Sequence, residues 1–147
     1  MRKRFFSVCF CCLLLVFTTA AGTRAQLPGV IEHAYIPFDF IVRGKTLPAG
    51  DYSIRRINDG PEALGMAASD NHGNVVFETE PVQARRAPNR GRLVFHRYGN
   101  TYFLYEVWTG GEYIGRELPI SRAERVVRRE FTAMKAENPE TVDIALN

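Results

Sequence analysis

Three histidines are the first residues in this sequence whose type suits metal binding or proton transfer. His33, His72 and His96 stand far apart in the chain, and their spacing matches no metal-ligand pattern such as His-x-x-x-His. His72 falls within the polar stretch 70–73, which is typical of an exposed turn. We therefore predict no metal site and no cofactor. His96 lies in a strand-like run, where a packed imidazole is the ordinary role.

Carboxylates and hydroxyls give little support to a hydrolase. Asp39 is the carboxylate of most interest because it lies between Phe38 and Phe40, and burial among aromatic rings would suit an acid. A cap or a pair with an arginine is the alternative role. There is no Gly-x-Ser-x-Gly motif for a nucleophile. We predict no catalytic residue, and Asp39 and His96 are the two positions at which one would be sought.

Arginines are concentrated where a helix is expected. Four of the 19 Lys and Arg residues lie in residues 1–25, and 13 of the other 15 are Arg. Arginine pairs with phosphate or carboxylate in a bidentate manner and stacks on aromatic rings. The predicted interaction patch, for an anionic lipid headgroup, polysaccharide or acidic protein, comprises Arg122, Arg125, Arg129, Tyr102 and Trp108. A solvated helix face balanced by acidic neighbours, with the aromatic residues in the core, is the alternative.

The N-terminal residues have the pattern of a Sec-type signal peptide. A basic start, Arg2 to Arg4, precedes an apolar run over residues 5–17, and the small residues before position 26 fit a cleavage site. We predict cleavage between Ala25 and Gln26, a mature chain of residues 26–147 forming one domain, and a periplasmic or extracellular location. An uncleaved signal anchor is the alternative, but the apolar run is shorter than the roughly 20 residues of a spanning helix.

Removal of this leader changes the composition. All three cysteines lie in it, which excludes disulfides and cysteine-ligated metals from the mature chain. With 15 basic and 16 acidic residues left, the net charge changes from +3 to −1. General affinity for nucleic acid therefore loses its support. We expect an envelope or extracellular partner and no transmembrane span in the mature chain.

A β-hairpin is the clearest structural element. Two β-type runs, Arg92–Tyr98 and Thr101–Trp108, are joined by Gly-Asn, a strong signal for a two-residue turn. With that turn, His96 faces Phe103 and Val94 faces Tyr105. Both faces of the hairpin are largely apolar, so we predict that it is central and covered on both sides.

Shorter strands surround this hairpin in the prediction. Residues 30–42 alternate around Pro37, residues 51–57 and 62–69 give two more strands, and residues 74–80 give a strand that Pro81 ends or kinks. Residues 43–50 are predicted to be a polar turn. Strands at this spacing predict a mainly β fold, a single antiparallel β-sandwich or barrel-like domain.

One amphipathic helix follows the strands. Ser121 and Glu124 fit a capping box, in which each side chain accepts a hydrogen bond from the other residue's backbone amide. Helical spacing then extends from 122 to about 136, with an apolar stripe predicted to pack on one hairpin face. Residues 141–146 fit a final edge strand. The stripe contains Ala123, Val126, Val127, Phe131 and Met134.

Three stretches, residues 36–52 (PFDF and LPAGDY), 93–100 (LVFHRYGN) and 115–125 (GRELPISRAER), carry a resemblance. Together they resemble a family of small exported bacterial proteins of the acidobacterial type. The resemblance spans most of the mature chain and implies export, but it brings no activity, cofactor or catalytic residue.

These observations favour an exported, non-enzymatic interaction or structural module of the cell envelope. A small-ligand carrier is the alternative, and an apolar cavity would indicate it. A hydrolase is the second alternative, which a cleft joining Asp39 or His96 to another titratable group would indicate.

Overall fold

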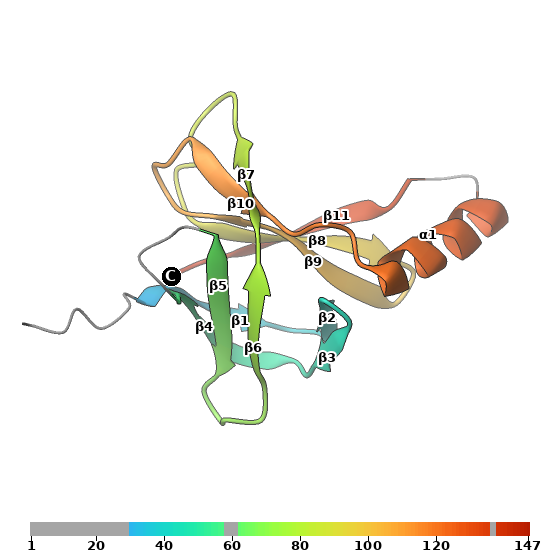
Figure 1. Ribbon diagram of the computed structural model, residues 1–147, viewed down its shortest axis with the longest axis horizontal. Coiled ribbons are helices and arrows are strands. Elements are labelled where there is room, and N and C mark those ends of the chain that lie inside the picture. The colour runs from blue at the N-terminus through green and yellow to red at the C-terminus, as the bar shows by residue number, and fades with distance from the viewer. Residues whose placement is uncertain (1–29, 58–61, 136–137) are drawn as a thin grey trace, which may run out of the picture.

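The computed structural model describes residues 30–57, 62–135 and 138–147, so the predicted leader and its cleavage site lie outside the described residues. The described residues form two antiparallel sheets and a helix (Figure 1). The mainly β, sandwich-like fold with a C-terminal helix is therefore confirmed. The elements are β1 (Val30–Ile36), β2 (Phe40–Val42), β3 (Lys45–Leu47), β4 (Gly50–Arg56), β5 (Ala63–Ala68), β6 (Asn74–Glu78), β7 (Glu80–Gln83), β8 (Arg92–Tyr98), β9 (Thr101–Trp108), β10 (Ile114–Glu117), α1 (Arg122–Lys135) and β11 (Glu140–Ala145).

The two sheets are joined at both sides. One sheet has the order β1-β4-β5-β6 and the other β11-β8-β9-β10-β7, with the β2–β3 hairpin beside β9. The chain changes sheets at Thr79, whose amide and hydroxyl both donate to the Glu62 carbonyl, at 2.7 and 3.1 Å. At the other side His33 and Asn147 exchange backbone hydrogen bonds of 3.2 and 2.9 Å. Because hydrogen bonds join the two sheets at both sides, the sandwich is closed in the manner of a barrel.

Aromatic and branched side chains fill the space between the sheets. Phe40 contacts the rings of Tyr52 and Phe95 edge to face, with centroids 5.2 and 5.5 Å apart. All three are at most 1% exposed. Further core side chains come from both sheets and include Ile36, Ile54, Leu64, Met66, Leu93, Leu104 and Val107.

The central hairpin has the predicted bounds. Gly99 has a φ of 63°, as the first residue of a type II′ turn requires. His96 pairs with Phe103 as predicted, but Val94 pairs with Glu106 and not with Tyr105. Tyr105 is the extra residue of a β-bulge, which local patterning does not reveal.

Two other strand predictions are corrected. Residues 45–47 form β3, paired with β2, where a turn was expected. Pro81 does not end its strand, because the break falls at Thr79 and Pro81 lies within β7, opposite Arg116. The missing amide proton of Pro81 is tolerated on β7 because this strand is at the edge of its sheet.

Helix α1 has the predicted start, and the predicted end at residue 136 falls outside the described residues. Its apolar stripe is only partly covered: Val127 and Phe131 are half-buried, whereas Val126 and Met134 are 48% and 77% exposed. The helix extends away from the sheets in Figure 1, so much of it faces solvent. Among the described residues, no helix has the length and apolar character needed to cross a membrane. The final strand is confirmed as β11.

Candidate functional site

A buried polar cluster joins the first turn of helix α1 to the hairpin. Glu124 Oε1 lies 2.7 Å from His96 Nδ1 and accepts a hydrogen bond from the Tyr98 hydroxyl at 3.3 Å. The Glu124 and His96 side chains are only 5% and 12% exposed. The His96 ring stacks on Tyr105 with centroids 3.9 Å apart, which the bulge at Tyr105 permits. This cluster holds an otherwise exposed helix against β8 and β9.

Burial and negative charge change the ionisation of the cluster's tyrosines. Burial, the charge of Glu124 and the hydrogen bond to it raise the pKa of Tyr98 to about 12, against a smaller opposite effect of Arg128. Burial also raises the pKa of Tyr105, assisted by the nearby carboxylates of Glu117 and Glu106. Both phenols therefore remain protonated donors at neutral pH.

The cluster contains an acid and an imidazole in contact, and the acid is also joined to the cap of the helix. Ser121 Oγ accepts the Glu124 amide at 3.1 Å and so caps the helix. Among the described residues no hydrogen bond joins Ser121 to His96, so the sequence of contacts in a Ser-His-acid triad is missing. The near-complete burial of Glu124 also keeps substrate away from its carboxylate.

The same contacts correct half of the predicted capping box. Ser121 performs its part, since its hydroxyl accepts the amide of the third helical residue. The Glu124 carboxylate is turned toward His96 and Tyr98 on the hairpin. Two hydrogen-bond partners on the sheet displace the local contact that the sequence pattern predicts.

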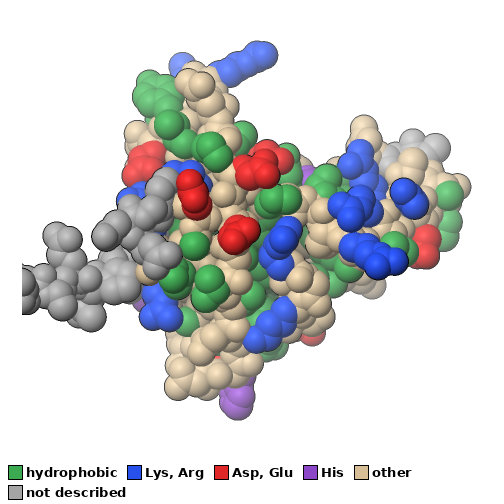
Figure 2. Space-filling view, in the orientation of Figure 1, with side chains coloured by type: hydrophobic (Ala, Val, Ile, Leu, Met, Phe, Trp, Pro, Cys, Tyr) green, Lys and Arg blue, Asp and Glu red, His purple; other side chains and the backbone are tan. Residues whose placement is uncertain are grey.

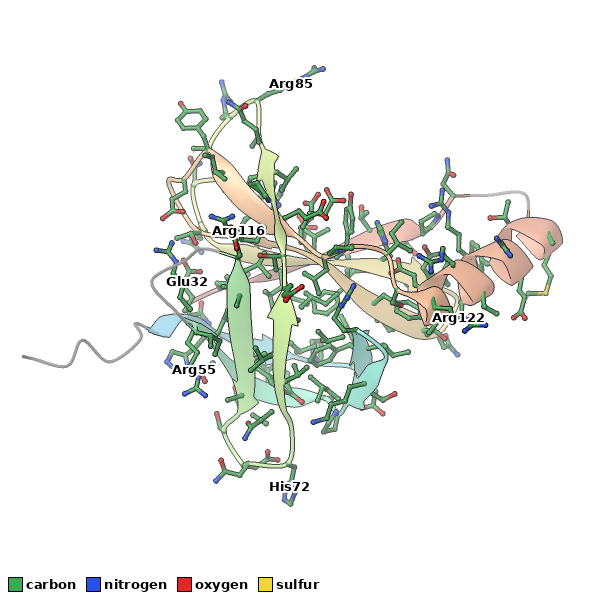
Figure 3. The ribbon with its side chains drawn as sticks, viewed as in Figure 1. Glu32, Arg55, His72, Arg85, Arg116 and Arg122 are labelled. Atoms are coloured by element: carbon green, nitrogen blue, oxygen red, sulfur yellow. The ribbon has the colours of Figure 1, made fainter. Side chains whose placement is uncertain are left out.

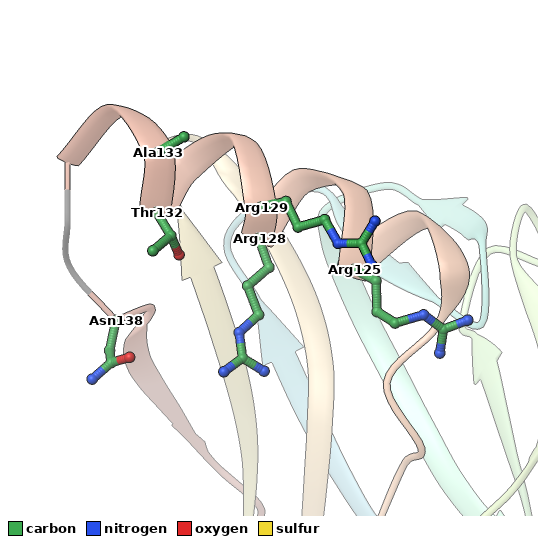
Figure 4. Close-up of a pocket in the computed structure, with 6 residues that line it drawn as sticks. All are labelled: Arg125, Arg128, Arg129, Thr132, Ala133 and Asn138. Atoms are coloured by element: carbon green, nitrogen blue, oxygen red, sulfur yellow. The ribbon is translucent and has the colours of Figure 1, made fainter.

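A hollow of about 620 Å³ lies along one flank of helix α1 (Figure 4). We call it the arginine hollow. Its lining residues are Arg125, Arg128, Arg129, Thr132, Ala133 and Asn138. The first five occupy adjacent positions on the helix surface because they are three or four residues apart. Asn138 comes from the segment that returns toward β11, so it lies across the hollow from the helix.

The guanidinium groups of the hollow have no acidic partner among the described residues. The ion pairs found there involve Arg56, Arg92, His96 and Arg97 instead. Arg125 donates to the Ile120 carbonyl at 3.0 Å, a contact that leaves its positive charge uncompensated. Figure 2 shows Lys and Arg side chains gathered over this part of the molecule. The hollow is therefore suited to an anion.

The structure does not bring the predicted patch together as one surface. Arg122, Arg125 and Arg129 all lie on helix α1. Tyr102 lies on β9, where it stacks on Phe38 with centroids 3.9 Å apart and packs against the core.

Trp108 is only 4% exposed and does not belong to a surface patch. Its indole donates to Glu106 at 2.7 Å, and Gly115 lies directly on its ring. A residue without a side chain on the neighbouring strand allows this close packing, which explains why Trp108 is buried.

The remaining candidates lie apart from one another. Asp39 is exposed and accepts the Ala49 amide at 2.9 Å, which closes the loop around the β2–β3 hairpin and matches the capping alternative. His33 is exposed on β1, and His72 is exposed in the turn between β5 and β6 (Figure 3). Within the described part of the chain, no three His, Cys, Asp or Glu side chains are grouped as metal ligands.

The predicted patch does not include four of the lining residues, Arg128, Thr132, Ala133 and Asn138. Arg128 and Thr132 follow Arg125 at helical spacing, so this spacing could have identified them. Asn138 joins the hollow only through the return of the chain after the helix, and no local signal predicts that.

No protein-family model matches this chain, and no curated protein and no solved structure proved similar to it.

Proposed function

We propose that the protein is an exported, non-enzymatic interaction module of the cell envelope, and that its arginine hollow binds an anionic partner. The observation that carries this proposal is the group of three guanidinium groups around one hollow, without acidic partners in the described part of the chain. Arginine binds phosphate, sulfate and carboxylate groups through two parallel hydrogen bonds. Export rests on the signal-peptide pattern of residues 1–25.

Charge on the helix supports the same proposal. Glu124 is buried and bonded to the hairpin, so its charge is directed away from the hollow. Glu130 is exposed, but helical spacing places it on the flank opposite Arg125 and Arg128. The arginine flank therefore presents a local positive field although the predicted mature chain is close to neutral.

The interior favours an interaction module over a carrier of apolar ligands. Phe40, Tyr52 and Phe95 occupy the middle of the space between the sheets and contact one another there. A carrier needs that space for its ligand. The surface of the helix is the better candidate for binding.

Retention on washed envelope fractions tests the proposal. We expect Arg125→Glu combined with Arg129→Glu to reduce retention, and we expect retention of the wild type to weaken as salt rises. The matched control compares Arg129→Glu with Arg55→Glu, because Arg55 is also exposed but lies on β4. Only the helix variant should show reduced retention. Unchanged retention of the folded double variant would disprove the role of the hollow.

A further inference from the structure

The ribbon formed by β7 and β10 projects from the sheets at the top of Figure 1. We call its outer end, residues 83–86 together with 113–114, the ribbon tip. The Ala84 amide donates to the Tyr113 carbonyl at 2.9 Å, and Ile114 pairs with Gln83. These contacts place the two segments of the tip side by side.

The body of the protein does not cover the ribbon tip. Strand β9 pairs with β10 only at Arg116 and Glu117, so the outer part of the ribbon consists of β7 and β10 alone. Gly115 is the outermost buried position, where an added Cβ would lie 2.5 Å from the Trp108 ring. Beyond it, Tyr113 and Ile114 are 58% and 53% exposed.

Two large apolar side chains are exposed at the tip. Ile114 is the first residue of β10 and Tyr113 lies in the bend directly before it, so both side chains lie at the outer end of the ribbon. A hydrophobic patch is visible beside the tip's cationic side chains in Figure 2.

Arginines outnumber acidic residues around the tip. Residues 81–91 and 112–116 contain four arginines and one acid, Glu112, which pairs with Arg56 at 3.7 Å. Arg85 and Arg86 are exposed, and none of the ion pairs among the described residues involves them. Arg85 points outward from the end of the loop that follows β7 (Figure 3). The tip thus combines unpaired cations with exposed aromatic and aliphatic groups.

We propose that the ribbon tip binds the surface of an anionic lipid bilayer, with Tyr113 and Ile114 inserted at the headgroup level. Arginines near anionic headgroups add attraction, and amphipathic aromatic rings favour the membrane–water interface. This surface is separate from the arginine hollow and goes beyond the function proposed for it.

Charge complementarity favours an anionic bilayer as the partner. Such a bilayer supplies phosphate groups to the unpaired Arg85 and Arg86 at the depth at which the exposed Tyr113 and Ile114 would enter the headgroup region.

Flotation of the full chain with lipid vesicles tests this proposal. The wild type should float with vesicles of phosphatidylcholine mixed with phosphatidylglycerol, and far less with phosphatidylcholine alone. Arg85→Gln with Arg86→Gln should lower the partition coefficient by about 30-fold. Tyr113→Ser with Ile114→Ser should also reduce it, while the melting temperature stays near that of the wild type because both side chains are exposed.

Arg55→Glu, an exposed change on β4, is the control and should still float. If Arg125→Glu with Arg129→Glu loses flotation while the ribbon variants keep it, the lipid binds at the helix and the proposal is wrong. It is also wrong if the wild type fails to bind anionic vesicles. Retention on native membranes without flotation on pure lipid would overturn it in favour of a protein partner. Because the tip would itself hold the protein on envelope fractions, retention through the hollow is measured in the Arg85→Gln, Arg86→Gln background, so that failure of one proposal can be distinguished from failure of the other.

Discussion

At the scale of single residues, the pKa of the buried Tyr98 hydroxyl is set by its contacts. Its ring contacts Phe103 and Phe131 edge to face, and its hydroxyl donates to the Glu124 carboxylate. Burial and the negative charge of Glu124 both oppose loss of the phenolic proton, so the pKa of Tyr98 is raised to about 12. A titration of Tyr98 is therefore sensitive both to the burial of the hairpin and to the contact between the helix and the hairpin.

The raised pKa of Tyr98 predicts an alkaline dependence of stability. In the unfolded chain the phenol loses its proton near pH 10.0, whereas in the folded protein it keeps the proton until about pH 12. Its contribution to stability is therefore complete below pH 10 and decreases as the pH rises through 12. Tyr98→Phe should show a shallower loss of unfolding free energy over this range, and its absorbance titration should lack the last tyrosinate step. Identical titrations would contradict the assignment.

At the scale of elements, helix α1 is joined to the hairpin by few contacts. Glu124 bonds to His96 and Tyr98, and Phe131 meets the Tyr98 ring edge to face. A packed interface would distribute this role over many apolar contacts. A single substitution at Glu124 should therefore weaken the attachment of the helix.

Replacement of that carboxylate should destabilise the protein. Glu124→Ala leaves the buried groups of His96 and Tyr98 without their acceptor, and we expect a cost of about 1–3 kcal/mol in chemical denaturation. Glu130→Ala removes an exposed carboxylate from the same helix and should change stability by less than about 0.5 kcal/mol. Equal effects of the two variants would show that the buried cluster does not anchor the helix.

Elements with local signals were predicted from the sequence. The Gly99–Asn100 turn and the cap at Ser121 each act over a few residues, so the hairpin and the helix start were found. The sequence did not predict β3, because Lys45 and Thr46 are polar and pair only with a strand in register. The chain changes sheets at Thr79, where it bonds to the distant residue Glu62. A contact of this range produces no periodic pattern in the local sequence, so the change was not predicted.

The candidate site was predictable to a smaller extent. Helical spacing gave the arginines of α1, whereas Trp108 was included in the predicted patch with the core as its alternative, and the structure places it in the core beneath a glycine of β10. Glu124 was interpreted as a local cap because its two partners lie 28 and 26 residues away in the chain. Contacts between residues so far apart in the chain can be recognised only when the arrangement of the sheets is known.

For the whole molecule, the contact between β1 and the end of the chain closes one side of the sandwich. Leu146 is 5% exposed and belongs to the core, and its amide donates to the Gly91 carbonyl at 2.9 Å. Its neighbour Asn147 is bonded to His33 on the opposite sheet. The closure therefore combines backbone hydrogen bonds with a buried apolar side chain.

Loss of that side chain should weaken the closure. Leu146→Ala creates a cavity at the edge of the core, and we expect it to cost about 2–5 kcal/mol of unfolding free energy. Amide exchange at His33 should also become faster, because its hydrogen bond to Asn147 would open more often. A change below about 0.5 kcal/mol would show that the closure contributes nothing to stability.

The pairing of His33 with Asn147 also sets the orientation of a tethered molecule. Asn147 meets β1 at His33, while helix α1 lies at the other end of β11 (Figure 1). A linker joined to Asn147 therefore leaves the described body at the end away from helix α1. A molecule attached there to a sensor chip, a bead or a larger assembly would hold the arginine hollow on its outward side, accessible to a dissolved partner.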